Sequence, residues 1–442
     1  MDTMKAFLIA LLLTLPLRAQ VRAAQTTTVT LLQFSDYHSH ALPFYTGDGT
    51  RGGIARAVRY LRDEKRRGAL VFSGGDTINK GAPAWSDKYG CAEWPWLNGI
   101  VDAMAFGNHD ADYGADAFAR CRADIRYPIL SANTAGFPRS VVLEARGARI
   151  GVFAVAGSDF PRLMHVPGFT FGDPIAAARE VVRELREREH VDAVIMIGHE
   201  HLDADLALAR AVPGIDLIFG SHSHLRRDLT RIPDTNTWFV SPGQYLEAIC
   251  RVELTIADHA VTSVRGGLVP VDERLPEDRA VARKVARMER ALENDPQYRA
   301  QFEVIARLAA PLTIEALAKR TLEVMRDAAR ADAALSTFSS FRQALPAGPL
   351  TLEQLTAALP YENDLVVCTM TGAQLQRVFD FSAARRGTDG ESYIAAPPPL
   401  DPARDYRVAT TDFLANVAYK EVFNCTPQKT GLRVRETLRK AL

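Results

Sequence analysis

Side chains that can bind metals or transfer protons follow five apolar segments of this chain, each where the segment ends. The clearest case is residues 101–106, which run directly into Gly107-Asn108-His109-Asp110-Ala111-Asp112. A polar turn between glycines would have a similar composition, so this stretch alone would not indicate a site. The repetition does. The residues after the five segments are Asp36 and His38, then Asp76, then Asn108, then His199, and finally His222 and His224.

These seven side chains supply oxygen and nitrogen ligands in a number that suits two divalent cations, with Asp76 as the carboxylate that bridges them. Mixed imidazole and carboxylate ligation fits zinc, manganese, iron or cobalt and excludes an all-oxygen calcium site. Two such ions about 3.5–4 Å apart can hold a phosphoryl group and generate hydroxide at neutral pH. A single His or Asp at a strand end is usually structural, so the prediction rests on the recurrence at five places.

The elements that must position these residues are strands alternating with helices. Apolar and alternating segments predict strands at 28–34, 69–72, 101–106, 150–155, 193–197 and 215–219. Helical spacing predicts a helix from residue 54 to the basic tail before Gly68, and Pro174 opens another that reaches Glu189. Such alternation is typical of a layered α/β domain, in which sites gather at the carboxyl ends of the strands.

Length and composition indicate a two-domain globular protein. The chain has 442 residues, too many for one ordinary core. Lys plus Arg and Asp plus Glu each total 53, so the net charge of zero gives no electrostatic case for nucleic acid or an anionic membrane as a partner.

The first residues have the pattern of a secretory signal peptide. Lys5 precedes an apolar stretch at 6–17, and Val21-Arg22-Ala23 offers small or aliphatic residues at the cleavage positions. The sequence therefore predicts a signal peptide at 1–24, a periplasmic or secreted product, and no stable membrane span after cleavage. An uncleaved N-terminal anchor is the alternative.

Five cysteines are too few for a disulfide scaffold. Cys91 and Cys121 lie in loop-like or helix-end sequence and can pair, whereas Cys368, inside an apolar segment, is expected to be a small core residue. No Cys-x-x-Cys spacing supports a thiolate zinc site.

Taken as a set, the motifs resemble those of the calcineurin-like metallophosphoesterases over residues 29 to about 255. The stretch 107–114 resembles more narrowly the secreted 5′-nucleotidase and UDP-sugar hydrolase branch. The resemblance implies one metal on Asp36, His38, Asp76 and His224, and the other on Asp76, Asn108, His199 and His222. It also implies that His109 and Asp112 act in catalysis and are not metal ligands. Because the carboxylate is three residues away, it can orient the imidazole and favour its protonated form, which stabilises charge on the phosphoryl group.

The second half resembles the C-terminal domain of the same 5′-nucleotidases, through residues 359–363 and 371–375. The resemblance implies that Arg342, Phe413 and Asn363 bind the substrate. Two loops depart from the family: Thr337-Phe338-Ser339-Ser340 stands where the family has Asn-Gly-Gly-Gly, and Val417-Ala418-Tyr419 where it has Gly-Gly-Asp. The family's second base-clamping ring has no secure counterpart.

The expected protein has a four-layer α/β/β/α metallophosphoesterase domain at 25–270, a charged helical linker at 271–310 and a smaller α/β substrate-binding domain at 311–442. The expected activity is two-metal hydrolysis of a small phosphoester, a nucleotide or a UDP-sugar. One alternative is a non-nucleotide or cyclic-nucleotide ester, including the sulfate ester of a carrier thiol. Another is a surface-binding protein without turnover, against which the intact ligand set argues. The oligomeric state, the metal and the base are not indicated.

Overall fold

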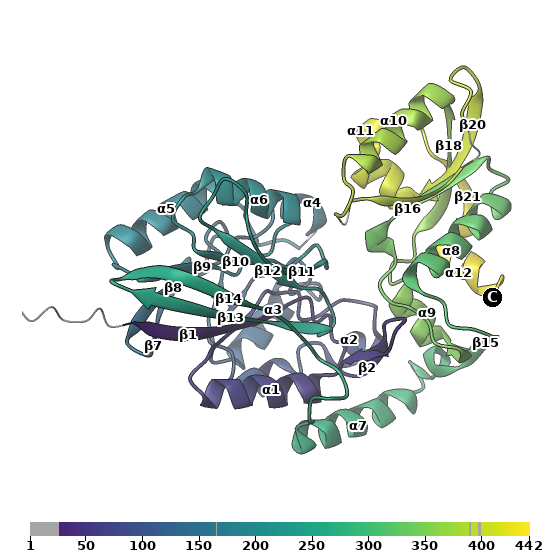
Figure 1. Ribbon diagram of the computed structural model, residues 1–442. Coiled ribbons are helices and arrows are strands. Elements are labelled where there is room, and N and C mark those ends of the chain that lie inside the picture. The colour runs from purple at the N-terminus through teal and green to yellow at the C-terminus, as the bar shows by residue number, and fades with distance from the viewer. Residues whose placement is uncertain (1–25, 165, 389, 397–398) are drawn as a thin grey trace, which may run out of the picture.

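The computed structural model describes residues 26–164, 166–388, 390–396 and 399–442. The predicted signal peptide lies outside these ranges. Figure 1 shows two α/β units, with helix α7 (Arg279–Glu293) on the path between them. Within the described part of the chain, we find no helix with the length and apolarity needed to cross a bilayer.

The first unit contains two six-stranded sheets. One has the order β14-β13-β1-β4-β5-β6, in which β1, β4, β5 and β6 are parallel neighbours. The other has the order β11-β12-β10-β9-β8-β7, in which β8, β9, β10 and β12 are parallel. The first sheet comprises β1 (Thr27–Phe34), β4 (Leu70–Ser73), β5 (Ala103–Ala105), β6 (Ile129–Leu130), β13 (Ala248–Ala257) and β14 (Ala260–Pro270). The second comprises β7 (Ser140–Ala145), β8 (Ala148–Phe153), β9 (Ala193–Met196), β10 (Leu217–Phe219), β11 (Arg226–Arg231) and β12 (Trp238–Pro242).

Four layers follow from how these sheets bury their two faces. Side chains alternate along a strand, so Leu31 and Ile195 point into a core between the sheets while their neighbours point outward. The first sheet packs outward on α1 (Ile54–Arg66) and α3 (Ala115–Ala123), and the second on α5 (Pro174–Glu187) and α6 (Leu202–Ala211). The predicted α/β/β/α architecture is confirmed.

The helices form where their sequence patterns predict. On α1, Ile54, Val58 and Leu61 make one buried stripe at helical spacing. On α5, Pro174 occupies the first turn and the Asp173 side chain accepts a hydrogen bond from the amide of Ala176, which fixes the start of the helix.

The second unit is built on a five-stranded sheet of order β19-β16-β20-β18-β21. Its strands are β16 (Ala333–Thr337), β18 (Asp364–Thr371), β19 (Ser392–Ala395), β20 (Asp405–Thr411) and β21 (Gln428–Arg433). The short pair β15 (Val304–Leu308) and β17 (Gly348–Thr351) lies beside it, and the main helices are α8 (Ile314–Ala328), α9 (Leu352–Ala358) and α10 (Gly372–Ala383). This smaller α/β unit matches the second part of the predicted fold.

Helix α7 is amphipathic rather than solvated on all sides. Val281, Val285 and Leu292 are buried in a core of the first unit, and Lys284 lies over the Trp96 ring with its Nζ atom 4.1 Å from the ring centre. The charged residues that dominate the composition occupy the opposite face. Tyr298 is still packed on the same core, so the chain leaves the first unit only just before β15.

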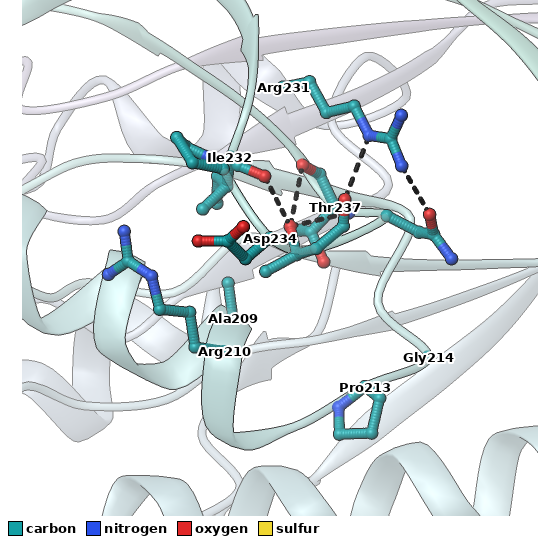
Figure 2. Close-up of a pocket in the computed structure, with 11 residues that line it drawn as sticks. Ala209, Arg210, Pro213, Gly214, Arg231, Ile232, Asp234 and Thr237 are labelled. Carbon is teal, nitrogen blue, oxygen red and sulfur yellow. Dashed lines mark hydrogen bonds between the residues drawn. The ribbon is translucent and has the colours of Figure 1, made fainter.

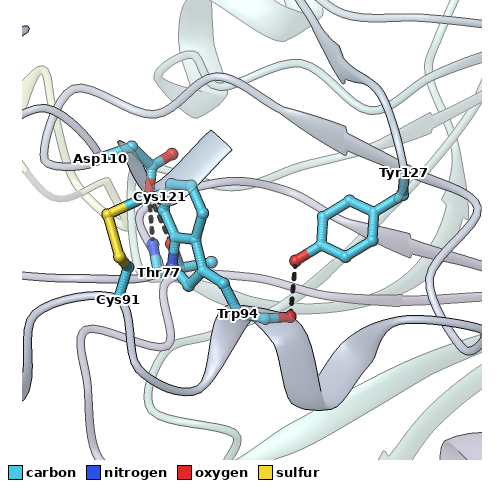
Figure 3. Close-up of a disulfide and its surroundings, with 6 residues drawn as sticks. All are labelled: Thr77, Cys91, Trp94, Asp110, Cys121 and Tyr127. Carbon is cyan, nitrogen blue, oxygen red and sulfur yellow. Dashed lines mark hydrogen bonds between the residues drawn. A yellow bond between two sulfur atoms is a disulfide. The ribbon is translucent and has the colours of Figure 1, made fainter. Parts of the chain in front are cut away.

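Two disulfides are present among the described residues. Cys91 pairs with Cys121, as the sequence indicated, beside Trp94 (Figure 3). Cys368 pairs with Cys425, so its assignment as an unpaired core residue was wrong: β18 buries it, but the fold brings residue 425 against that strand. Cys250 is a buried free thiol.

Candidate active site

The seven predicted ligands come together because five strands end at one region of the first unit. Within each sheet these strands are parallel neighbours, so their carboxyl ends share an edge. Asp36 and His38 follow β1, Asp76 follows β4 and Asn108 follows β5, whereas His199 follows β9, and His222 and His224 follow β10. The site is therefore divided between the two sheets.

One group of four side chains contains Asp36, His38, Asp76 and His224. Their donor atoms all lie within 4.8 Å of one another. The Nε2 atoms of His38 and His224 are 3.0 Å apart, and His224 Nε2 is 3.1 Å from Oδ1 of Asp36. Two imidazole nitrogens and carboxylate oxygens that converge in this way can hold one divalent cation.

A second group shares Asp76 and adds His199 and His222, again with donor atoms within 4.8 Å of one another. The Nε2 atom of His199 is 3.1 Å from Oδ2 of Asp76. Asp76 thus belongs to both groups, the position that a bridging carboxylate requires. Asn108 is buried, and its amide oxygen has no hydrogen-bond partner among the described residues.

The ring nitrogens show that these residues suit cations. The Nδ1 atom of His38 lies 3.2 Å from the carbonyl of Ile78, and that of His199 lies 2.6 Å from the carbonyl of Gly74. Each carbonyl can only accept, so Nδ1 carries a proton and, in the neutral imidazole, Nε2 is left as a lone-pair donor facing the cluster. Burial keeps the pKa of His38 well below its usual value, which favours its neutral ligand form. Burial also opposes charge on His199, but the nearby Asp76 carboxylate outweighs it and raises the pKa of His199 to about 9, so a cation bound at its Nε2 atom would displace a proton.

The backbone at the site is strained in a consistent way. Five predicted ligands have positive backbone φ angles between 48° and 58°, a region that residues other than glycine rarely adopt. They are Asp36, His38, Asp76, His222 and His224. Gly107 is required by close approach, since a Cβ atom there would lie 2.2 Å from the Asp76 amide nitrogen. Strain of this kind clusters at functional sites.

His109 and Asp112 form the predicted dyad. The Nδ1 atom of His109 lies 2.8 Å from Oδ2 of Asp112, and the His109 amide donates to Oδ1 of Asp76 at 2.8 Å. Burial opposes charge on the imidazole, but Asp76 and Asp112 outweigh it and raise the pKa of His109 to about 10. The geometry therefore supports a protonated imidazole beside the metal-ligand cluster.

Asp110, which the motif also contains, has a structural role. Its buried carboxylate accepts hydrogen bonds from the amides of Gly107, Asp76 and Thr77 and from the Thr77 hydroxyl, as Figure 3 shows in part. It fastens the β4 and β5 loops to each other, and this holds Asp76 against the segment that carries Asn108.

A cavity of about 520 Å³ connects this cluster with the second unit. The predicted substrate-binding residues Arg342, Phe413 and Asn363 line it together with His109 and Asp76. Figure 1 shows the loops of β16 and α9 turned towards the first unit. The cavity volume falls in the range typical of small-molecule sites.

Arg342 reaches across from the second unit to the metal-ligand cluster. Its Nη1 atom lies 3.1 Å from Nε2 of His224. The side-chain amide of Gln244 donates a hydrogen bond to the Arg342 carbonyl at 2.8 Å, and the Gln244 side-chain oxygen accepts one from Arg342 Nη1 at 3.3 Å. The Arg342 Nε–H is buried without a hydrogen-bond partner among the described residues. Its guanidinium is therefore poised for an anion beside the cluster.

Tyr361 is a site residue that the sequence reasoning missed. Arg342 Nη2 donates to its hydroxyl at 3.1 Å, and its ring lines the cavity with Phe413. Tyr361 is 40% exposed and Phe413 41%, which is unusual for large apolar side chains. A usable signal was present, since Tyr361 lies inside the motif at 359–363.

A second hollow, of about 650 Å³, lies between the end of α6 and the β11–β12 hairpin (Figure 2). Its polar groups bond to one another: Arg231 donates to the Thr235 carbonyl and to Asn236, and the Thr235 hydroxyl donates to the Ile232 carbonyl. Neither an imidazole nor a predicted ligand is among its lining residues. This hollow therefore lacks the chemistry that the cavity at the cluster has.

Residues 29–226 match the calcineurin-like phosphoesterase family. Residues 312–396 match the 5′-nucleotidase C-terminal domain, so the chain combines a metallophosphoesterase domain with a domain of this second kind. Protein UshA of Yersinia enterocolitica is 24% identical over 88% of this chain and 86% of its own length.

Two solved structures share the fold. A 5′-nucleotidase precursor from Thermus thermophilus has a TM-score of 0.74 and 22% identity, covering 94% of this chain and 96% of its own. The sulfate thiohydrolase SoxB of Thermus thermophilus has a TM-score of 0.72 and 21% identity, covering 93% and 94%. These two likenesses are of fold. The family matches and the two metal-ligand groups make the chain a metal-dependent hydrolase of phosphoesters.

Proposed function

We propose that this protein is a 5′-nucleotidase-type hydrolase that removes phosphate from nucleotides or splits their sugar derivatives. One observation carries the proposal: a single cavity joins the metal-ligand cluster and the His109–Asp112 dyad of the first unit to two exposed aromatic rings and an arginine of the second. A nucleotide has a matching division into a phosphate end and a flat base. The name of one relative, the 5′-nucleotidase of Vibrio cholerae, which is 28% identical over 46% of this chain, agrees with it.

The seven predicted ligands would hold two divalent cations, for which zinc, manganese, cobalt and iron are the candidates. Such ions would supply positive charge to the phosphoryl group and lower the pKa of the attacking water. His109, held protonated by Asp76 and Asp112, places a cationic N–H donor at the same cavity wall. Arg342 adds a second, because its guanidinium borders His224.

The second unit would select the rest of the substrate. Tyr361 and Phe413 offer ring faces on which a base can stack, and Asn363 offers an amide that can donate and accept hydrogen bonds. Ser339 and Ser340, from the loop that departs from the family pattern, line the cavity with hydroxyl groups. We further propose the domain bounds given above and a periplasmic or secreted location.

The test is a substrate comparison after metal removal and reconstitution. Chelation with EDTA should abolish hydrolysis of p-nitrophenyl phosphate, and manganese, cobalt or zinc should restore it. AMP and UDP-glucose should then be cleaved with a lower KM than p-nitrophenyl phosphate. Activity indifferent to chelation would refute the metal mechanism.

The aromatic residues permit a sharper comparison. Phe413→Ala should raise KM for AMP by roughly 5- to 150-fold, because a stacked base is worth about 1–3 kcal/mol. It should leave p-nitrophenyl phosphate, which has no base, nearly unchanged. Tyr361→Ala should weaken both substrates, because the Tyr361 hydroxyl also accepts a hydrogen bond from Arg342, but it should weaken AMP more. Equal losses on both substrates would point to a folding defect. If AMP, UDP-glucose and 2′,3′-cyclic AMP are all refused while a thiol sulfate ester is cleaved, the nucleotide proposal is wrong and the resemblance to the sulfate thiohydrolase fold extends to function.

A further inference from the structure

A third cluster of metal-ligand side chains lies beside the dinuclear site, and two of its three members have no role in the proposed reaction. It contains Asp159, His201 and His222, whose donor atoms all lie within 4.8 Å of one another. Oδ2 of Asp159 is 2.9 Å from Nε2 of His201 and 3.3 Å from Nε2 of His222. Two imidazoles and a carboxylate that converge on one point form a donor set that zinc and similar divalent ions prefer.

The cluster is held in place by a buried carboxylate behind it. One oxygen of Glu200 accepts the amide of Ser158 and the other accepts the amide of His201, both at 2.8 Å. Glu200 is itself 1% exposed. It therefore ties the loop before α4 (Phe160–Leu163), which carries Asp159, to the start of α6, which carries His201.

Asp159 faces the two imidazoles with Oδ2, and its other oxygen is buried without a hydrogen-bond partner among the described residues. The side chain is 9% exposed. A buried carboxylate oxygen left in this state is costly. The His201 side chain is 31% exposed and lines the cavity, so an ion has a route from solvent to the cluster.

From this geometry we propose that Asp159, His201 and His222 form a third, regulatory site for a zinc-type cation. His222 belongs to this cluster and also to the group with Asp76 and His199. Its Nε2 atom faces Asp159, which leaves Nδ1 for the dinuclear site. A cation on Nε2 releases the ring proton to solvent and leaves His222 as an imidazolate between two cation sites. The third ion therefore adds positive charge to the wall of the substrate cavity, where it can hold a phosphate away from the dinuclear site. Excess zinc should therefore inhibit the enzyme. The inhibition rests on the proposed hydrolase function, whereas the binding does not.

The test measures bound zinc and activity on the same samples. Full-length protein reconstituted with two zinc equivalents is dialysed against rising free zinc, and bound metal is counted by mass spectrometry without substrate. His201→Ala removes one ligand of the third cluster only. Asp203→Ala is the matched control, because Asp203 is exposed, lines the same cavity two residues away and is not in the cluster.

Wild type and Asp203→Ala should bind a third equivalent and lose p-nitrophenyl phosphate hydrolysis over the same zinc range. His201→Ala should keep the first two ions and its basal activity, but bind the third at least roughly tenfold more weakly and resist inhibition by the same factor. Asp159→Asn, which preserves shape, should behave like His201→Ala. Saturation of wild type at two ions, or a third ion retained in His201→Ala, would overturn the site. A third ion without inhibition would overturn the regulatory role. A protein inactive on every phosphoester would refute the proposed function but leave the zinc comparison readable.

Discussion

Removing the Cys91–Cys121 disulfide should destabilise the first unit without changing the chemistry of the site. The bond closes a segment of sequence separation 30 that contains Asn108, His109 and Asp112. In the folded protein that segment is already fixed by the Asp110 carboxylate and by β5. The disulfide therefore acts mainly on the unfolded chain, whose freedom it restricts.

The loop length sets the expected magnitude. With a sequence separation of 30, the loop-closure relation gives about 3.5 kcal/mol at 25 °C. With a urea m-value of about 3 kcal/mol/M, the unfolding midpoint should fall by about 1 M. The turnover number on p-nitrophenyl phosphate should stay near the wild-type value, because the folded geometry is held by other contacts.

The assay is urea unfolding of Cys91→Ala/Cys121→Ala, followed by tryptophan fluorescence. All four tryptophans (Trp85, Trp94, Trp96 and Trp238) belong to the first unit, so the signal reports on that unit alone. The matched control is Cys368→Ala/Cys425→Ala, which removes a bond of separation 57 from the second unit and should leave this midpoint nearly unchanged. An unaltered midpoint with lower turnover would refute the reasoning, since the bond would then be holding the native geometry.

Three further outcomes follow from the site and its surroundings. Asp76→Asn should lose both metal ions, measured by mass spectrometry, because Asp76 belongs to both ligand groups. His109→Ala should keep both ions yet lower turnover by roughly 10²–10⁴-fold, the usual scale for a positioned proton donor. Burial raises the pKa of Glu93 from 4.5 to about 7, against the hydrogen bonds from Tyr37 and Trp85 that lower it. The folded state thus favours protonated Glu93. The resulting contribution to the free energy of unfolding is fully present below about pH 4.5 and is lost as the pH rises through about 7. Urea unfolding at several pH values should show that Glu93→Gln lacks this loss, which is on the order of 3 kcal/mol.

The sequence alone predicted a layered α/β first unit and the side chains that meet in the central cluster, whereas the four-layer form was implied by the family resemblance. The reason is local: each predicted ligand follows an apolar strand within five residues, and parallel strands that neighbour one another end at the same edge. A pattern repeated along the chain is therefore enough to predict that Asp36, Asp76 and His199 meet. The spacing of His109 and Asp112 likewise specified their contact before any tertiary information was needed.

Other features depended on contacts that no local pattern encodes. The sequence predicted a charged helical linker where α7 lies, because charged residues dominate its composition, yet three apolar residues are buried against the first unit. Cys368 is buried in the core, as its apolar segment indicated, but only the fold reveals that Cys425 lies against it and forms a disulfide with it.

The tertiary structure also decided how the cavity is completed. Arg342 and Tyr361 reach the site from the second unit, and their approach to His224 depends on how the two units pack. Asp159 and His201 are 42 residues apart, on a loop and at a helix start that Glu200 ties together. Contacts between distant segments arise from the burial of whole elements against one another, so neither composition nor spacing can specify them in advance.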